Sequence, residues 1–288
     1  ESAGFGSEWL VWGGMATLAF GALGMLASQR PARLAGYAVI VSSGTLMAMI
    51  GLGRPEVTAA ALYYLPTSTF AIAAFFLLTE LMDRSRSADP GVQRRPEDEE
   101  DHLPFALADL DLQPGSNLDD DEELLIGQPI PASIALLGLA FICCTLLVAG
   151  LPPLSGFVGK FAMLSALLST PEPNGSLTAV TWTLLGLVVL SGLFAMIALS
   201  RTGIRFFWAP VGRKAPVLNS VEYLPVAVLV GLCVFFTVRA EPLMRYARDT
   251  AQVLYQPKGY IDAVLNTQPR ATPTNAERMG APAPQVLP

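Results

Sequence analysis

Seven long apolar runs constrain what this chain can fold into. Each run is close to twenty residues, the length of helix that crosses about 30 Å of hydrocarbon. Helices are the only spanning elements that do not have to close into a barrel, because every backbone amide finds its hydrogen-bond partner within the same segment. The sequence therefore predicts an all-α, polytopic membrane helix bundle of about seven spans. The runs cover roughly residues 9–28, 34–53, 60–82, 131–150, 152–170, 177–200 and 222–239.

Composition supports this prediction and narrows the range of partners. Of the 288 residues, 52% are hydrophobic and 15% are charged, and the mean hydropathy is +0.47, above the range of most soluble domains. Residues 83–125 hold 14 of the 24 acidic residues but only 4 of the 18 basic ones. That segment therefore carries a net charge of -10 and the remainder carries +4, so no nucleic-acid partner is expected.

Charge and composition also divide the chain into parts. The expected parts are three transmembrane helices in 1–82, an acidic, solvated and partly disordered loop in 83–130, four transmembrane helices in 131–239 with a broken helix around 150–170, an interfacial amphipathic helix in 240–265, and a disordered tail in 266–288. Seven spans would place Arg30 and Arg201 on opposite sides of the membrane.

This sequence contains few residues that could bind a metal or a cofactor. Cys143, Cys144 and Cys233 lie inside apolar runs without Cys-x-x-Cys spacing, and the single histidine, His102, lies in the acidic loop. No zinc, haem or iron-sulfur site is expected from these residues, and no cofactor.

Lys160 is the strongest candidate for a functional residue. It lies in the middle of the run 152–170, and only Lys214 and Lys258 share its residue type. An ammonium group at this depth is about 15 Å from water, farther than a lysine side chain reaches. A lone cation there costs roughly 2.5 to 3.5 kcal/mol on insertion scales, so it normally faces a hydrated cavity or a partner charge. Desolvation penalises the ammonium form, and such a lysine can exchange its proton.

The residues before Lys160 predict a helix break. Pro152 and Pro153 have no N–H groups, so the carbonyls of Val148 and Ala149 would lose their helical partners. Breaks of this kind mark the ion site in transporters. The candidate ion-path residues next to this break are Ser155, Gly156 and Gly159.

Two interpretations of this segment remain open. Lys160 relays protons at a broken helix, or it is a structural lysine in a helix-helix turn, paired with a carboxylate on a neighbouring helix. Glu80 and Glu222 lie near the ends of their runs. A charge partner for Lys160 is therefore expected from outside this chain.

Hydroxyl side chains at mid-depth extend the candidate site. Ser42, Thr67 and Ser68 lie within the second and third runs. Such hydroxyls either bond back to their own helix or line an ion path.

The run Gly-Leu-Pro-Pro-Leu-Ser-Gly-Phe-Val-Gly-Lys-Phe, residues 150–161, resembles the broken helix of the antiporter-like subunits. These subunits are shared by respiratory complex I, membrane-bound hydrogenases and Mrp-type cation/proton antiporters. Further stretches resemble the D subunit of the Mrp antiporters in particular, and the similarity extends over about residues 8–265. These stretches are residues 60–65 with Ser68 and Thr69, residues 197–203 with Phe207 and Trp208, and the segment from Glu241 to Pro257.

The resemblance implies a fold and a location for the site. The family has fourteen spans, and the seven runs resemble spans eight to fourteen, its carboxy-terminal half. Since the chain starts at Glu1 rather than at an initiator methionine, we expect it to be part of a longer polypeptide. Lys160 matches the proton-transferring position of span twelve. Ser42 and Thr67 stand where many relatives have histidines, so a relay here would use hydroxyls and water.

The function implied is that of a proton-translocating subunit of a hetero-oligomeric Mrp-type Na⁺/H⁺ antiporter in a bacterial plasma membrane. Its partners would be the other antiporter subunits, membrane lipid, protons and Na⁺. It would be a secondary transporter subunit rather than an enzyme. Two alternatives stay open: a proton-pumping membrane subunit of a redox enzyme such as complex I or a hydrogenase, and a non-conducting scaffold subunit.

Overall fold

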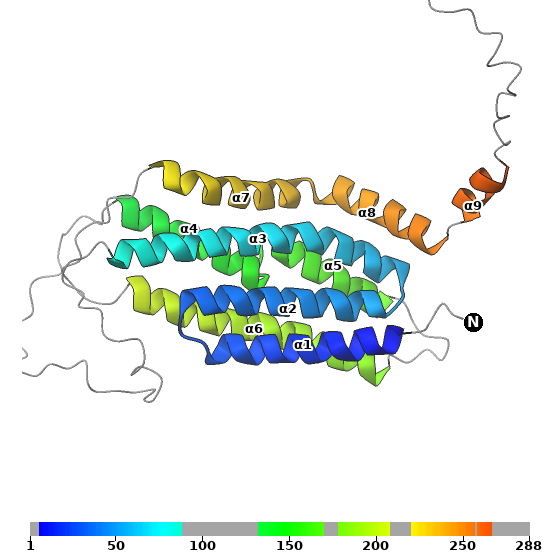
Figure 1. The fold of residues 1–288 in the computed structure, drawn as a ribbon, viewed down its shortest axis with the longest axis horizontal. Helices are drawn as coiled ribbons and strands as arrows, with labels where there is room; N and C mark the ends of the chain where they lie inside the picture. The colour runs from blue at the N-terminus through cyan, green and yellow to red at the C-terminus, as the bar shows by residue number, and fades with distance from the viewer. Residues whose placement is uncertain (1–5, 88–131, 170–177, 208–219, 257, 267–288) are drawn as a thin grey trace, which may run out of the picture.

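The computed structural model describes residues 6–87, 132–169, 178–207, 220–256 and 258–266 (Figure 1). Within these ranges every regular element is a helix, which confirms the all-α prediction. Most of the predicted acidic loop and nearly all of the predicted tail lie outside the described residues. The helices are α1 (Ser7–Ala27), α2 (Pro31–Gly51), α3 (Pro55–Ser87), α4 (Ala132–Ala149), α5 (Ser155–Ser169), α6 (Ala179–Phe207), α7 (Ser220–Val238), α8 (Ala240–Tyr255) and α9 (Lys258–Leu265).

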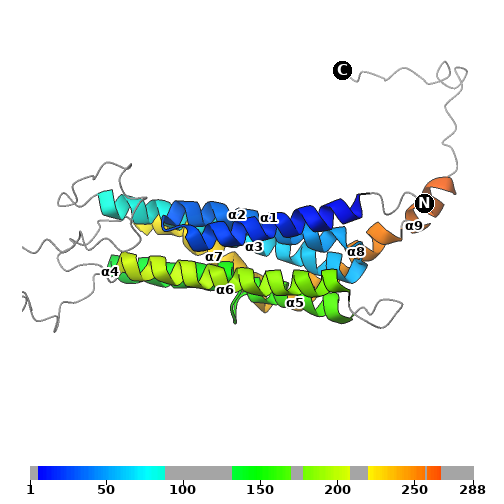
Figure 2. The same cartoon turned by 90° about the horizontal axis from the view of Figure 1, so that it is seen from below.

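The helices from α1 to α7 run alongside one another along one long axis (Figures 1 and 2). Small residues allow the closest approach, between α1 and α2. A Cβ atom added to Gly14 would lie 2.4 Å from the backbone nitrogen of Ala48, and one added to Gly44 would lie 2.5 Å from that of Leu18. Because no side chain separates the two backbones there, α1 and α2 form a tightly packed pair.

The crossings of the bundle are made by helices of different lengths. By length and hydropathy α1, α2, α3 and α6 are each able to span a membrane. The helices α7 and α8, which meet at an angle of 79°, form a fifth candidate span if they are taken together. The helices α4 and α5 are shorter, and they follow one another along the bundle beside α3 (Figure 1). The membrane helix bundle with one broken helix is thus confirmed. The two halves of the broken helix follow one another along the bundle (Figure 1), whereas the sequence prediction counted each as a separate span.

This count changes which residues share an end of the bundle. An Arg201 terminal nitrogen, on α6, donates hydrogen bonds to the carbonyls of Leu26 (2.9 Å) and Ser28 (2.7 Å) at the end of α1. Arg205, one turn later, hydrogen-bonds Gln29. Arg30 therefore lies at the same end of the bundle as Arg201, and the prediction that they lie on opposite sides is wrong. With α4 and α5 as one crossing, the chain returns to this end after α6.

The amphipathic segment after α7 is helical, as α8 and α9. Ala247 and Ala251 form the buried face of α8, and the hydroxyl of Tyr255 is hydrogen-bonded to that of Thr58 on α3, at 3.0 Å. The helix α8 therefore packs against the first turns of α3. Its location in a membrane interface stays a prediction.

Candidate functional site

The helix α4 ends where the sequence predicts a break. Gly150 has a φ of 76°, a left-handed conformation that favours glycine. Its N–H and that of Leu151 both bond to the carbonyl of Leu146, at 3.0 and 2.9 Å. Pro152 and Pro153 follow, and α5 begins at Ser155. In Figure 1 the junction lies near the middle of the bundle's long axis.

The Lys160 side chain closes this break from the α5 side. Its Nζ donates hydrogen bonds to the carbonyls of Ala149 at 3.0 Å and Val148 at 3.3 Å. These are the two carbonyls that Pro152 and Pro153 deprive of helical partners. The contact is geometrically natural because side chains on a helix lean toward its N-terminus, which for α5 faces the break. A cation at the C-terminus of α4 also interacts favourably with the helix dipole.

The lysine is buried in the bundle, with 8% of its surface exposed. A Cβ atom added to Gly150 would lie 2.6 Å from Lys160 Cδ and 3.0 Å from its Nζ. Gly150 thus provides both the left-handed turn and the space for the lysine stem. The side chain does not reach toward an end of the bundle, in agreement with the prediction from the sequence.

The two halves of the broken helix overlap closely. A Cβ atom on Gly156 would lie 2.2 Å from the Leu147 carbonyl oxygen, so the first turn of α5 passes directly against the last turn of α4. The hydroxyl of Ser155 is buried beside the Cys233 thiol and bonds to no carbonyl or hydroxyl among the residues described.

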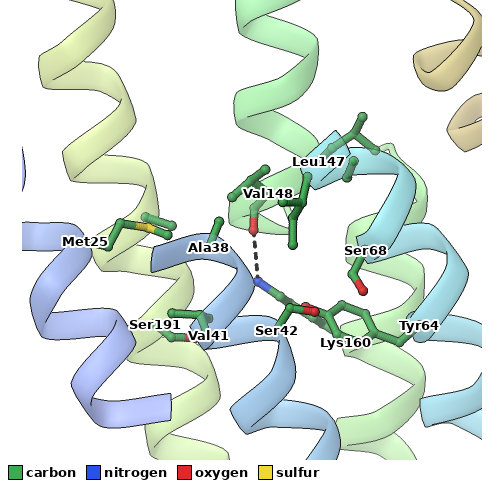
Figure 3. Close-up of a pocket in the computed structure, with 13 residues that line it drawn as sticks. Met25, Ala38, Val41, Ser42, Tyr64, Ser68, Leu147, Val148, Lys160 and Ser191 are labelled. Atoms are coloured by element: carbon green, nitrogen blue, oxygen red, sulfur yellow. Dashed lines mark hydrogen bonds between the residues drawn. The ribbon is translucent and has the colours of Figure 1, made fainter. Parts of the chain in front are cut away.

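A small cavity of about 10 Å³ opens beside Lys160, which is room for about one water molecule. Figure 3 shows Lys160 reaching into it from α5, with Ser42, Tyr64 and Ser68 around it from α2 and α3. Ser191 on α6 completes the polar lining. Apolar side chains form the rest of the wall: Met25, Ala38, Val41, Ala71, Ile72, Leu147, Val148 and Ala195.

The structure brings together some of the residues proposed from the sequence and separates others. Ser42 and Ser68 share the cavity with Lys160, whereas Thr67, Ser155, Gly156 and Gly159 are not among its lining residues. The Thr67 hydroxyl bonds back to the carbonyls of its own helix, at Tyr64 (2.8 Å) and Tyr63 (3.3 Å). This is the structural role that the sequence left open for such hydroxyls.

Two polar lining residues, Tyr64 and Ser191, were not proposed from the sequence. Tyr64 stood out only within the stretch of residues 60–65 that carries the family resemblance, and Ser191 is a lone hydroxyl in an apolar run. Each is buried. A buried hydroxyl in an apolar run is a usable signal, but only the packing of α3 and α6 tells which cavity it lines.

The surroundings of Lys160 contain no second charge in the part of the chain that is described. No carboxylate there makes an ion pair with it, and its hydrogen-bond acceptors are the two α4 carbonyls. Glu80 instead pairs with Arg84 near the end of α3, with 2.8 Å between Nε and Oε1. A charge partner from outside the chain stays a prediction.

Comparisons with known proteins find relatives of the chain among the D subunits of cation/proton antiporters. No protein-family model matches it. Over 272 residues, 94% of the chain, it is 48% identical to the D subunit of a probable K⁺/H⁺ antiporter of Rhizobium meliloti strain 1021, of which it covers 48%. It is 25% identical over 265 residues to the D subunit of a Na⁺/H⁺ antiporter of Bacillus subtilis strain 168, covering 91% of the chain and 45% of the relative.

A solved structure supports the same fold. The structure of the Mrp complex from Dietzia sp. DQ12-45-1b contains a chain that matches with a TM-score of 0.58 at 18% identity, over 90% of this chain and 50% of that one. The chain thus spans about half the length of the relatives it matches.

Proposed function

Because this chain is related over nearly its whole length to the D subunits of monovalent cation/proton antiporters, we propose that it forms part of a proton-translocating subunit of such an antiporter. It would act with other subunits in a hetero-oligomeric complex of the bacterial plasma membrane, as a secondary transporter component rather than an enzyme. Protons and a monovalent cation are its transported partners. Membrane lipid surrounds it.

The observation that carries the proposal is the pair of carbonyls held by Lys160. An ammonium group has three N–H donors, and two of them are used by Val148 and Ala149. The third is free to face the cavity. When the ammonium loses that proton, the neutral amine keeps two N–H groups for the same two carbonyls and gains a lone pair on the cavity side.

This arrangement lets Lys160 change charge with little rearrangement. Both protonation states satisfy the orphan carbonyls of α4, which would otherwise be buried without donors at a cost of about 1–3 kcal/mol each. Burial favours the neutral amine and the α4 dipole favours the ammonium. Opposing effects of this kind poise a group to accept and release protons.

The two relatives differ in the cation that their names give, so the cation transported here needs its own test. The relative at 48% identity is described as belonging to a probable K⁺/H⁺ antiporter, and that at 25% as belonging to a Na⁺/H⁺ antiporter. We therefore extend the sequence prediction of Na⁺ to a monovalent cation, with K⁺ and Na⁺ tested side by side.

The test is cation-induced alkalinisation of everted membrane vesicles that contain the complete complex, with KCl and NaCl added separately. Lys160→Ala should lower the exchange rate by about a hundredfold or more at equal assembled protein. Lys258→Ala, on α9, is the matched control and should exchange at the wild-type rate. Normal exchange by Lys160→Ala would favour the scaffold alternative, and flavin or iron-sulfur clusters in the purified complex would favour the redox-enzyme alternative.

A further inference from the structure

The hydroxyl groups around the Lys160 cavity differ in how their protons are used. Ser68 donates to the carbonyl of Leu65 at 3.1 Å, and Ser191 donates to that of Val188 at 2.7 Å. Both protons are therefore held by the backbone of their own helices. Ser42 on α2 and Tyr64 on α3 also line the cavity (Figure 3), and among the described residues neither hydroxyl donates to a backbone carbonyl.

Two hydroxyls that line one small cavity and are not bonded to backbone carbonyls can pass a proton on. Each hydroxyl has one donor and two acceptor positions. When one of these two hydroxyls donates to the other during transfer, the acceptor keeps its own O–H for a third group. Ser68 and Ser191 cannot release their protons without breaking a bond to a buried carbonyl. The Ser42 and Tyr64 pair is thus the polar part of this cavity suited to proton transfer.

The position of Tyr64 is fixed tightly beside Lys160. Only 4% of its surface is exposed, and a Cβ atom on Gly159 would lie 3.0 Å from its Cδ2. The Tyr64 ring therefore packs against the residue that precedes Lys160 on α5. The cavity between the lysine and the hydroxyls has room for about one water molecule, which is enough to connect them.

We propose that Tyr64 and Ser42 form a two-hydroxyl relay that carries protons to and from Lys160, an inference that rests on the proposed function. The Lys160 ammonium gives a proton to the cavity water, which gives one of its own protons to the first hydroxyl oxygen. That hydroxyl releases its original proton to the second, and the second releases its proton to water. The cavity water and each relay hydroxyl gain one proton and lose one, so the positive charge moves from Lys160 to the water that accepts the last proton, and nothing is oxidised or reduced.

The chain offers a matched control in the neighbouring tyrosine. Tyr63 is also buried, but its hydroxyl donates to the Phe236 carbonyl on α7 at 2.9 Å and does not line the cavity. Tyr64→Phe keeps the ring that packs on Gly159 and removes only the hydroxyl. Tyr63→Phe removes an interhelical hydrogen bond of its own, so it is at least as damaging to packing.

In everted vesicles with the complete complex, Tyr64→Phe should slow exchange by roughly tenfold or more, whereas Tyr63→Phe should stay within about twofold of wild type. The ratio of exchange rates in H₂O and D₂O should rise in Tyr64→Phe, because proton transfer becomes rate-limiting. A defect in packing that merely lowers the number of active complexes would leave that ratio unchanged. Equal rates for Tyr64→Phe and Tyr63→Phe would overturn the proposal.

Ser42 gives a second, independent test should Tyr64→Phe fail to assemble. Ser42→Ala should slow exchange and Ser42→Thr, which restores a hydroxyl, should recover it; wild-type exchange by Ser42→Ala would overturn the relay. Lys160→Ala measured in the same vesicles separates the two proposals. If Lys160→Ala is inactive while Tyr64→Phe and Ser42→Ala are normal, the relay is wrong and the proposed function stands.

Discussion

Two helix ends in this bundle are closed in the same way by side chains of different chemistry. At the end of α1, Arg201 from α6 donates to the carbonyls of Leu26 and Ser28. At the end of α4, Lys160 from α5 donates to the carbonyls of Val148 and Ala149. In both cases a cation from another helix satisfies carbonyls that a helix C-terminus leaves without partners.

The chemistry of the two cations separates their roles. A guanidinium stays charged at any pH that a protein tolerates and has no lone pair to accept a proton, whereas an amine can lose its proton and regain it. Arg201 therefore joins α6 to α1 permanently. Lys160 joins α5 to α4 in either charge state and can carry a proton while doing so.

The spaces beside Arg201 and Lys160 also differ. The surface beside Arg201 is an open groove of about 610 Å³ along α6, whereas the cavity beside Lys160 has about 10 Å³. The first lies on the outside of a membrane-spanning helix and is open to lipid or other chains. The second restricts Lys160 to about one water molecule. Helix capping by a cation thus does not by itself indicate a role in proton transport. A cation that can deprotonate within a small polar cavity does indicate such a role.

Among substitutions that leave both cations in place, the largest effect on this comparison is expected from Gly150→Ala. The new Cβ would lie 2.6 Å from Lys160 Cδ, at a residue with a φ of 76°. We expect the lysine to be displaced from the α4 carbonyls, the free energy of unfolding to fall by about 1–3 kcal/mol and exchange to slow by at least about tenfold. Thermal unfolding of the purified complex and vesicle exchange measure the two effects.

Gly186→Ala on α6 is the control for that substitution. No atom lies within 4 Å of the added Cβ outside the local helix backbone, so thermal stability and exchange should both be unchanged. If Gly150→Ala behaved like Gly186→Ala, Lys160 would not depend on the geometry of the break.

A smaller and different effect is expected from Arg201→Ala. It removes two hydrogen bonds from a charged donor, but the two carbonyls lie at the end of α1, where water can replace the lost donor, so we expect a loss of about 1–2 kcal/mol in the free energy of unfolding. Exchange per assembled complex should stay at the wild-type rate. A specific loss of exchange at normal assembly would show that Arg201 takes part in transport, and the contrast between the two helix ends would be lost.

Much of the fold follows from local sequence signals. The apolar runs predict the positions of the helices because a spanning helix needs an uninterrupted hydrophobic length. The carbonyls of Val148 and Ala149 are identifiable because proline removes a specific hydrogen bond four residues earlier. Lys160 is identifiable because an ammonium group in an apolar run is costly.

The parts that the sequence did not predict depend on packing between helices. Hydropathy cannot tell whether α4 and α5 cross separately or share one crossing, because each run is apolar along its whole length. The end of the bundle at which Arg201 lies depends on how many times the chain crosses the bundle before it. Tyr64 and Ser191 meet Lys160 only because α3, α5 and α6 surround one cavity, and no pattern within a single helix encodes that meeting.

The central claim is that Lys160 functions by releasing a proton, and Lys160→Arg tests it most directly. The substitution keeps a cation that can donate to the α4 carbonyls but removes the ability to deprotonate. In everted vesicles at equal assembled protein, Lys160→Arg should retain no more than about 1% of wild-type exchange. The reciprocal control, Arg201→Lys, should exchange at the wild-type rate. Wild-type exchange by Lys160→Arg would contradict the account, because transport would then need no proton from this side chain.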